Sequence, residues 1–297
     1  MRPPSSSTDV SMAGISIVLP AHNEASAMAT LIPSLRTLYP EAELIVIDDG
    51  SDDGTGGTAQ KSGARVILHP YGMGNGAAIK SGARAASRQV MVFMDADGQH
   101  APADIERLIG KLNEGYDMVV GARGGASQAS MGRWLANAFY NRFASWMVGH
   151  HVADLTSGFR AARADKFREF LHLLPNGFSY PATSTMAFFR SGYTVGYVPI
   201  VAGKRVGKSH IRPLRDGIRF LLIMFRICTL YAPLKLFLPI SASVFVTGLG
   251  YYLYTYFTSG RFTNMSALLF ISSLLIFLIG LVSEQITMLL YQKSNQR

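Results

Sequence analysis

Residues 90–100 read Val-Met-Val-Phe-Met-Asp-Ala-Asp-Gly-Gln-His, an apolar run that changes abruptly into an acidic loop. The apolar part, Val90 to Met94, has the length and composition of a buried strand. The carboxylates of Asp95 and Asp97 can reach one hard cation from the end of such a strand, and Gln99 adds a neutral oxygen. The stretch therefore predicts a site for Mg²⁺ or Mn²⁺ that is shared with substrate phosphates.

Strands and helices alternate along the chain on both sides of this stretch. We expect strands at 15–19, 43–47, 65–68, 90–94, 118–120 and 193–200, and helices at 24–38, 74–86, 103–112, 133–148 and 161–173. This alternation predicts βαβ units and an α/β fold with a mostly parallel sheet. Ligands bind at the carboxyl ends of the strands in such sheets, so acidic residues at those ends are functional candidates.

A second acidic cluster, Asp48-Asp49-Gly50-Ser51, follows the expected strand at 43–47. A carboxylate there can accept hydrogen bonds from a ribose hydroxyl or a base N–H. The same segment also suits a turn followed by a helix cap at Asp53 or Thr55, and the two interpretations are compatible. Together with the loop at 95–99, this cluster favours a nucleotide site at one edge of the sheet.

A glycine-rich segment, Gly72-Met73-Gly74-Asn75-Gly76, invites a dinucleotide-binding interpretation. A dinucleotide fingerprint opens the first strand–helix turn of a fold, whereas this segment follows the third expected strand. We expect instead a tight loop that lets the backbone approach a ligand, followed by a helix packed closely through its alanines.

Charge almost disappears from the chain after Leu230. Two uncharged runs, 236–257 and 265–283, are each long enough to cross a bilayer core of about 30 Å, and a short link joins them. We expect residues 230–297 to form a two-helix transmembrane hairpin. The alternative, a pair of buried helices in a soluble core, rarely contains apolar runs of this length.

The formal net charge is +9, and much of the excess lies directly before the first apolar run. This position favours an anionic membrane surface over nucleic acid as the partner. Residues 211–229 combine a basic stripe with an apolar face, which predicts an amphipathic helix in the membrane interface; an ordinary surface helix is the alternative. Basic residues flank the hairpin on the side of both termini, so we expect a multi-pass protein of the inner or plasma membrane with cytoplasmic termini. Residues 1–14 are expected to be a flexible tail.

Arginine suits phosphate because its planar guanidinium donates hydrogen bonds in pairs. The candidate phosphate clamps are Arg123, Arg133, Arg160, Lys204 and Arg205.

Several segments occur in an order that is specific as a set. They are PAHNE from Pro20, IDDGSDDGT from Ile47, GNGAAIKSGARAA from Gly74, FMDADGQH from Phe93, GAR from Gly121 and DLTSGFR from Asp154. Over about residues 15–210 they resemble the inverting family-two glycosyltransferases, and more narrowly the dolichol- or undecaprenyl-phosphate sugar transferases. An interfacial helix and two spans are also similar to what many bacterial members carry.

The resemblance implies a GT-A-like catalytic domain at residues 15–210 that binds a UDP- or GDP-sugar as donor. It implies donor binding by Pro20, Glu24, Asp48, Asp49, Asp95 and Arg205, metal binding by Asp95, Asp97 and Gln99, a catalytic part for Arg123 with Asp95 and Asp97, and an acceptor-phosphate site at Arg133 and Ser157. Two positions depart from the family pattern: His22 stands where tyrosine is frequent, and His210 where lysine is frequent.

The acceptor can be argued from a residue type that is missing. A sugar-hydroxyl acceptor needs a general base, and relatives with such acceptors have an acidic residue where residues 177–185 of this chain have none. A phosphate is already anionic and needs positioning by cations instead. The missing base and the surplus arginines thus agree with what the resemblance implies, sugar transfer with inversion to a polyprenyl phosphate, and the charges that flank the spans predict that it takes place at the cytoplasmic membrane face. The alternatives are a hydroxyl acceptor, or a non-catalytic membrane protein that binds nucleotide-sugars. Paired spans and Glu284 leave self-association open.

Overall fold

The computed structural model describes residues 10–123, 131–177, 179–201, 203, 225 and 228–292. For residues 131–137 and 292 only the backbone is described. The chain divides into two compact units, residues 1–210 and 211–297, which we describe separately. Most of the helix expected at 211–229 lies outside the described residues, as do Lys204, Arg205, His210 and the side chain of Arg133.

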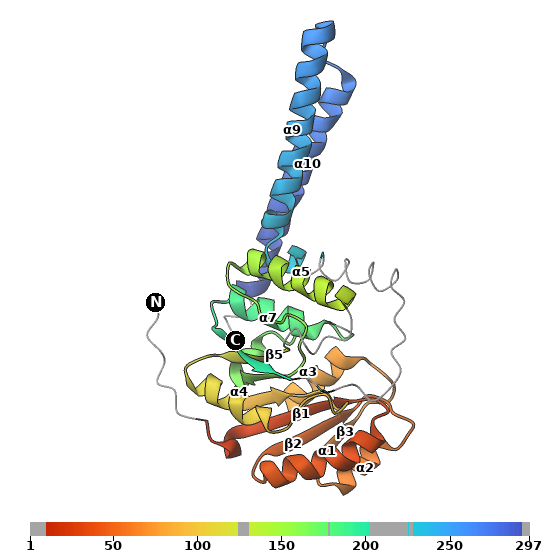
Figure 1. The fold of residues 1–297 in the computed structure, drawn as a ribbon. Coiled ribbons are helices and arrows are strands. Elements are labelled where there is room, and N and C mark those ends of the chain that lie inside the picture. The colour runs from red at the N-terminus through yellow and green to blue at the C-terminus, as the bar shows by residue number, and fades with distance from the viewer. Residues whose placement is uncertain are drawn as a thin grey trace. The chain divides into compact units, whose positions relative to one another are not determined.

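The first unit is built on a seven-stranded sheet with the order β3-β2-β1-β4-β6-β5-β7 (Figure 1). The strands are β1 (Ile15–Ala21), β2 (Glu43–Asp48), β3 (Arg65–Leu68), β4 (Val90–Phe93), β5 (Met118–Arg123), β6 (Arg160–Arg163) and β7 (Val195–Ile200). Strands β1 to β4 run parallel, as do β5 and β7, whereas β6 is antiparallel to both of its neighbours. The mostly parallel α/β fold expected from the sequence is therefore confirmed.

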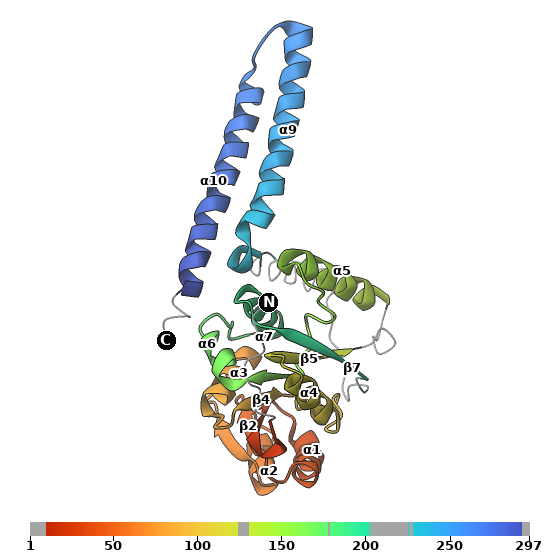
Figure 2. The same cartoon turned by 90° about the vertical axis from the view of Figure 1, so that its left-hand side faces the viewer.

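Helices cover both faces of this sheet (Figure 2). The helices of this unit are α1 (Ala25–Leu38), α2 (Thr55–Lys61), α3 (Asn75–Ala85), α4 (Asp104–Asn113), α5 (Met131–Val148), α6 (Ala164–Glu169) and α7 (Tyr180–Arg190), with a 3-10 turn η1 at Met12–Gly14. In the part of the chain that the structure describes, helix α5 packs on α7 and not on the sheet (Figure 2). One hydrophobic core joins β1 to α1 and α4, because alternate side chains of a strand point to the same face. On the opposite face, an added Cβ on Gly82 of α3 would lie 2.2 Å from the side chain of Val18, so that small residue permits the close helix–sheet contact that we expected.

Two expectations differ from the structure. Residues 161–173 were expected to be one helix, but Arg160–Arg163 form strand β6 and only Ala164–Glu169 are helical. The alanines of this segment favour a helix, yet the free edges of β4 and β5 recruit it into the sheet, since tertiary pairing outweighs local propensity. Within the flexible tail expected up to Gly14, residues 10–14 are instead ordered against the domain, because Val10 is buried and its N–H donates to Asn113 Oδ1 at 3.0 Å.

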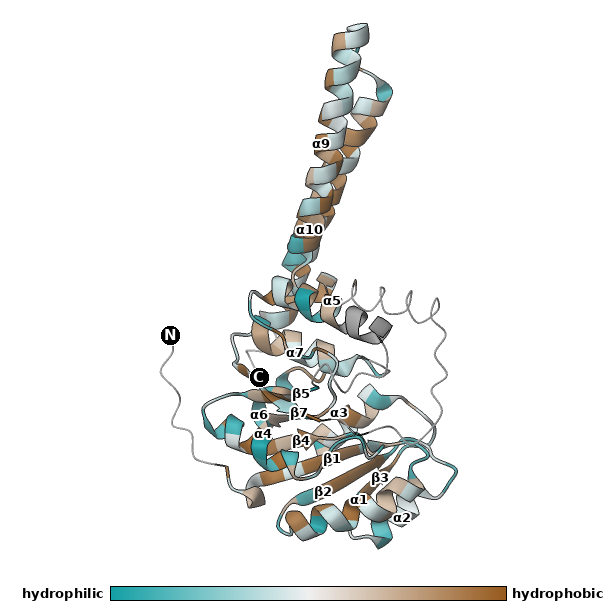
Figure 3. Cartoon of the chain, in the orientation of Figure 1, coloured by the Kyte–Doolittle hydropathy of each residue, from teal (hydrophilic) through white to brown (hydrophobic). Residues whose placement is uncertain are grey.

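The second unit contains the two apolar helices expected from the sequence, α9 (Pro233–Ser259) and α10 (Asn264–Gln292). They lie alongside each other (Figure 1), and hydrophobic residues extend along both (Figure 3). Both are long and apolar enough to cross a membrane, and only 11% and 17% of their most apolar windows are buried, which disfavours the buried-core alternative.

Small and polar side chains hold the two helices together, as is common between membrane helices. Ser241 Oγ donates to the Ser273 carbonyl at 2.9 Å, and Ser273 Oγ donates back to the Ser241 carbonyl at 3.1 Å. Glu284 of α10 accepts a hydrogen bond from the Leu234 N–H, a backbone group at the start of α9 that no preceding turn can satisfy. The carboxylate of Glu284 is therefore used within the hairpin.

Candidate active site

The loops after β1 and β2 bind each other at the carboxyl edge of the sheet. Asn23 N donates to Ser51 Oγ at 2.9 Å, and Glu24 N donates to Thr55 Oγ1 at the same distance. Asp53 accepts from Ala25 N at 3.0 Å and also from Thr55 N, so it caps the start of both following helices. The PAHNE and IDDGSDDGT segments thus form one hydrogen-bonded structure at this edge of the sheet.

The two carboxylates expected to meet the nucleotide are largely occupied by the protein itself. Asp48 accepts from Ser51 N at 3.0 Å and from Gly56 N at 2.9 Å, which closes the turn into α2. Asp49 accepts from His69 Nδ1 at 2.7 Å and from the N–H groups of Met73 and Gly74. Burial by itself would raise the pKa of Asp49, but these hydrogen bonds outweigh it and lower the pKa. Both carboxylates therefore fix the conformation of the loops at this edge of the sheet.

The glycine-rich loop approaches the chain's own backbone instead of leaving room for a phosphate. Gly76 N donates to the Gly177 carbonyl at 3.1 Å, and Ala77 N donates to the Asn176 carbonyl at 2.8 Å. A Cβ on Gly76 would lie 2.0 Å from the Pro175 carbonyl oxygen, so only glycine fits. These carbonyls satisfy N–H groups at the start of α3 that an anion would otherwise use. In this conformation these two N–H groups are already engaged, so a ligand contact of the loop, which stays a prediction, would involve other backbone atoms.

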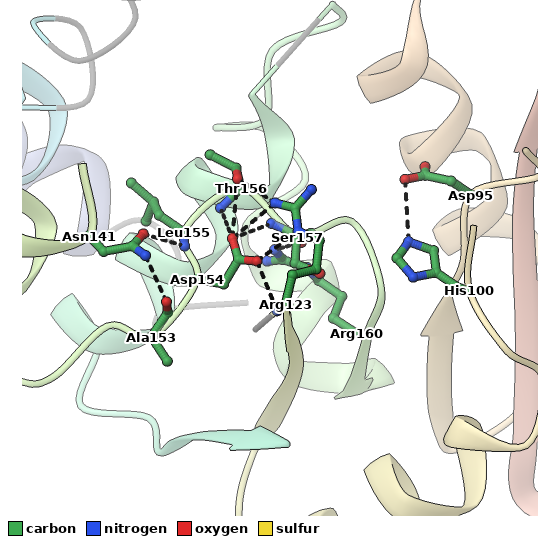
Figure 4. A network of polar contacts seen from close by, with 10 residues as sticks. All are labelled: Asp95, His100, Arg123, Asn141, Ala153, Asp154, Leu155, Thr156, Ser157 and Arg160. Atoms are coloured by element: carbon green, nitrogen blue, oxygen red, sulfur yellow. Dashed lines mark hydrogen bonds and ion pairs between the residues drawn. The ribbon is translucent and has the colours of Figure 1, made fainter. Parts of the chain in front are cut away.

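The acidic loop after β4 keeps carboxylate oxygens available. Among the described residues, the carboxylate of Asp97 accepts one hydrogen bond, from the Gln99 N–H to Oδ1 at 3.1 Å. Asp95 faces His100, whose Nε2 lies 4.0 Å from Asp95 Oδ2 and whose ring stacks on Phe159 (Figure 4). Burial raises the pKa of Asp95; the neighbouring His100 opposes this effect, and repulsion by Asp97 adds to it.

This carboxylate pair fits a hard divalent cation. A bound cation would relieve the repulsion between Asp95 and Asp97, and the side-chain oxygen of Gln99 is a further ligand of the right kind. Within the described residues there is no group of three or more His, Cys, Asp or Glu side chains that could hold a metal. The arrangement therefore suits a cation that takes its remaining ligands from substrate phosphates and water.

Arg123, at the end of β5, is held beside this loop by a two-pronged ion pair (Figure 4). Its Nε donates to Asp154 Oδ2 at 2.8 Å, its Nη2 donates to Asp154 Oδ1 at 3.1 Å, and Nη2 also reaches Thr156 Oγ1 at 2.6 Å. Burial would raise the pKa of Asp154, but Arg123 outweighs that effect and lowers it. The guanidinium of Arg123 is therefore fixed in direction, and its positive charge also opposes the rise in the pKa of Asp95.

Residues 16–171 match the model of the family described as glycosyl transferase family 2. The chain belongs to this family. Residues 232–289 match a second model, described as the GtrB C-terminal hairpin, so both the sheet-containing domain and the apolar helices have recognised relatives.

Relatives of this family-2 chain include sugar transferases named for polyprenyl phosphates. The dolichyl-phosphate hexose transferase of Haloferax volcanii is 29% identical over 71% of this chain and 92% of its own length. The undecaprenyl-phosphate mannosyltransferase of Micrococcus luteus is 31% identical over 65% of this chain and 85% of its own length. Among solved structures, glucosyl-3-phosphoglycerate synthase of Mycobacterium tuberculosis with Mn²⁺ and UDP-glucose has a TM-score of 0.56 and 27% identity, covering 72% of this chain and 78% of that one.

The family-2 domain buries Arg160 completely, which corrects its expected part as a phosphate clamp. Ser157 is also buried, with 1% of its surface exposed, and its hydroxyl has no hydrogen-bond partner among the residues that the structure describes. A contact between that hydroxyl and an acceptor phosphate therefore requires a movement of the 154–160 loop.

Sequence reasoning did not single out three residues of the family-2 site: His69, which holds Asp49, Asp154, which holds Arg123, and Tyr180. Asp154 opens the DLTSGFR segment and could have been found there. His69 and Tyr180 have no comparable sequence signal, because their partners are distant in the chain.

Proposed function

We propose that the protein transfers a sugar, with inversion, from a UDP- or GDP-sugar to a polyprenyl phosphate at the cytoplasmic face of the inner or plasma membrane. The start of α7 carries this proposal. Residues 177–190 contain no carboxylate that could deprotonate a hydroxyl acceptor, and the hydroxyls of Ser184 and Thr185 are engaged by Arg160 at 2.7 and 3.1 Å. An acceptor that arrives already ionised needs no general base. The relatives named for dolichyl and undecaprenyl phosphates support the same acceptor class.

On the donor side, Pro20, Glu24, Asp48 and Asp49 would form the nucleotide pocket, with Arg205 on the donor phosphates. Since Asp48 and Asp49 already bind backbone N–H groups, they would act mainly by fixing the loops, and their remaining lone pairs would be open to the ribose or base. Asp95, Asp97 and Gln99 would hold Mg²⁺ or Mn²⁺. This cation, when bound, neutralises charge on the departing diphosphate. Structures of glucosyl-3-phosphoglycerate synthase contain Mn²⁺ or Mg²⁺ with the nucleotide.

On the acceptor side, Arg123 would stabilise negative charge between the two substrates, and Arg133 and Ser157 would position the acceptor phosphate. The ion pair with Asp154 fixes the direction of the Arg123 guanidinium, so little reorganisation is required when the anions bind. Positioning and charge stabilisation, without a general base, are sufficient for attack by a phosphate oxygen.

The membrane setting is supported by α5 as well as by the two candidate spans. Phe139 and Trp146 of α5 are 64% and 52% exposed, and Phe143 lies between them with ring centroids at 6.2 and 5.7 Å. Offsets of four and three residues place the three rings on one helix face. Amphipathic aromatic side chains are favoured at membrane–water interfaces, where a polyprenyl phosphate presents its phosphate.

The test is a transfer assay in membranes with Mg²⁺ or Mn²⁺, a panel of UDP- and GDP-sugars, and undecaprenyl phosphate. Wild type should form a chloroform-soluble sugar lipid, Asp97→Ala should not, and Asp165→Ala, which changes an exposed carboxylate on α6, should behave like wild type. Transfer to a hydroxyl compound but not to the lipid phosphate would select the other acceptor class. Donor binding without any product would select a non-catalytic function.

A further inference from the structure

A guanidinium without a counter-ion lies in the interior of the domain. Arg160 has no exposed surface, and no carboxylate among the described residues comes within ion-pair distance of it. Its Nη1 donates to the Pro181 carbonyl at 2.9 Å and to the hydroxyls of Ser184 and Thr185, and its Nη2 donates to the Ser157 carbonyl. Burial lowers its pKa, because an isolated charge is costly in a protein interior.

Tyr180 adds a second connection between the same two segments. The guanidinium carbon of Arg160 lies 5.6 Å from the centre of the Tyr180 ring, and Tyr180 Oη donates to the Gly158 carbonyl at 2.8 Å. Both side chains therefore join the first turn of α7 to residues 157–158. Neither is exposed, so neither can touch a substrate in this conformation.

The backbone held in this way is in contact with a proposed metal ligand. A Cβ added to Gly158 would lie 2.7 Å from Asp95 Oδ2 and 3.2 Å from Tyr180 Oη. Residue 158 thus occupies the space directly behind the Asp95 carboxylate, where no side chain fits. The Asn75 side chain also hydrogen-bonds Asp95, and the first turn of α3, which begins at Asn75, is bound to residues 176–177 just before α7.

We propose that Arg160 and Tyr180 are positioning residues of the transfer site, which hold Gly158 against Asp95 and thereby set the direction of that metal-binding carboxylate. That these residues serve sugar transfer rests on the proposed function. The chain of contacts from α7 through Gly158 to Asp95 does not depend on it. The arginine is required for its shape, since its planar fork reaches four acceptors on two segments at once. Partners that orient a ligating carboxylate typically change metal affinity by about 10- to 100-fold when they are removed.

The experiment measures Mn²⁺ binding to the full-length protein in detergent, by counting free Mn²⁺ with electron paramagnetic resonance. Gly158→Ala forces a methyl group against Asp95, and Tyr180→Phe removes only the hydrogen bond to the Gly158 carbonyl. The matched controls are Gly110→Ala, whose added Cβ meets no atom within 4 Å, and Tyr193→Phe, whose hydroxyl binds Glu169 instead. Arg160→Lys keeps the positive charge but loses the planar guanidinium that reaches several acceptors. If this variant does not fold, Gly158→Ala and Tyr180→Phe still test the proposal.

The dissociation constant for Mn²⁺ should rise about 10- to 100-fold in Gly158→Ala and about tenfold in Tyr180→Phe. The latter should still fold cooperatively, with Tm lowered by about 1–6 °C for the lost buried hydrogen bond. The controls should stay within about twofold of wild type by the same reasoning. Wild-type affinity in both site variants, or no Mn²⁺ binding by wild type, overturns the proposal. If the variants lose Mn²⁺ affinity while wild type makes no sugar lipid with any donor, positioning stands and the proposed function fails.

Discussion

Replacing Asp154 with alanine should destabilise the family-2 domain by roughly 3 kcal/mol, because breaking a buried ion pair leaves the other charge uncompensated. Asp154 accepts two hydrogen bonds from the guanidinium of Arg123, at 2.8 and 3.1 Å, and further ones from the backbone N–H groups of Arg123, Thr156 and Ser157. Its side chain is 8% exposed and that of Arg123 is 28% exposed. Water can therefore replace part of what the guanidinium loses, which places the cost at the lower end of the range of about 3–5 kcal/mol.

Differential scanning calorimetry of the full-length protein in detergent measures this cost. In a domain of this size each kcal/mol changes Tm by about 2–4 °C, so Tm should fall by roughly 6–12 °C at pH 7. The matched control, Asp165→Ala, removes an exposed carboxylate of α6 and should change stability by less than about 0.5 kcal/mol. In the double variant with Arg123→Ala, the loss should be smaller than the sum of the single losses, since the two residues share one interaction.

The pH dependence has a definite sign. The pKa of Asp154 is lowered in the folded protein: burial would raise it, and Arg123 more than reverses that effect. A group with a lowered folded-state pKa contributes stability that is present above its ordinary pKa and is lost as the pH falls through the folded-state pKa. The Tm difference between wild type and Asp154→Ala should therefore be largest near neutral pH and shrink in acid. A difference that grows on acidification, or additive single losses, would refute the ion pair as the source.

Three further predictions concern single features. Gly50→Ala should destabilise the domain by at least about 1 kcal/mol in thermal unfolding, because the φ angle of Gly50 is +72° and the new Cβ would lie 2.5 Å from the Tyr71 carbonyl carbon. Its control is Gly57→Ala inside α2, whose added Cβ would meet no atom within 4 Å and should leave stability unchanged or raise it. Ser241→Ala should weaken packing of the hairpin by about 0.6 kcal/mol for each interhelical hydrogen bond lost, measured by unfolding in micelles, and Ser243→Ala is its control because that hydroxyl bonds only within α9. In a Trp134→Phe background, brominated lipids should quench Trp146 more strongly than aqueous iodide does; the reverse order would remove α5 from the membrane interface.

Sequence reasoning succeeded where local pattern and tertiary structure agree. The strand before Asp95 and the two apolar helices were predictable because long apolar runs bounded by charge have few alternatives. Strand β6 was missed because Arg160-Ala-Ala-Arg163 is a helix-favouring sequence that becomes a strand only between two existing strands.

In the candidate site, too, residues that act through nearby sequence were predictable, and residues whose partners are distant in the chain were not. The pair Asp95 and Asp97 follows from one short segment, but the buried state of Arg160 depends on α7, more than 20 residues away in the chain. Arginine type alone favours a phosphate ligand, and only the fold reveals that this guanidinium has been used internally. Burial is decided by partners that no motif contains.

The different uses of the carboxylates explain why one acidic pair stands out as the proposed metal site. Both carboxylate oxygens of Asp48, of Asp49 and of Asp154 accept hydrogen bonds from backbone N–H groups or side-chain donors. These three carboxylates therefore fix the conformation of their loops. Asp95 and Asp97 accept fewer hydrogen bonds, and their negative charges repel each other. A bound cation would remove this repulsion, so binding would stabilise the loop. Among the described residues of this edge, the loops are therefore held by one set of carboxylates so that another pair can remain open to ligands.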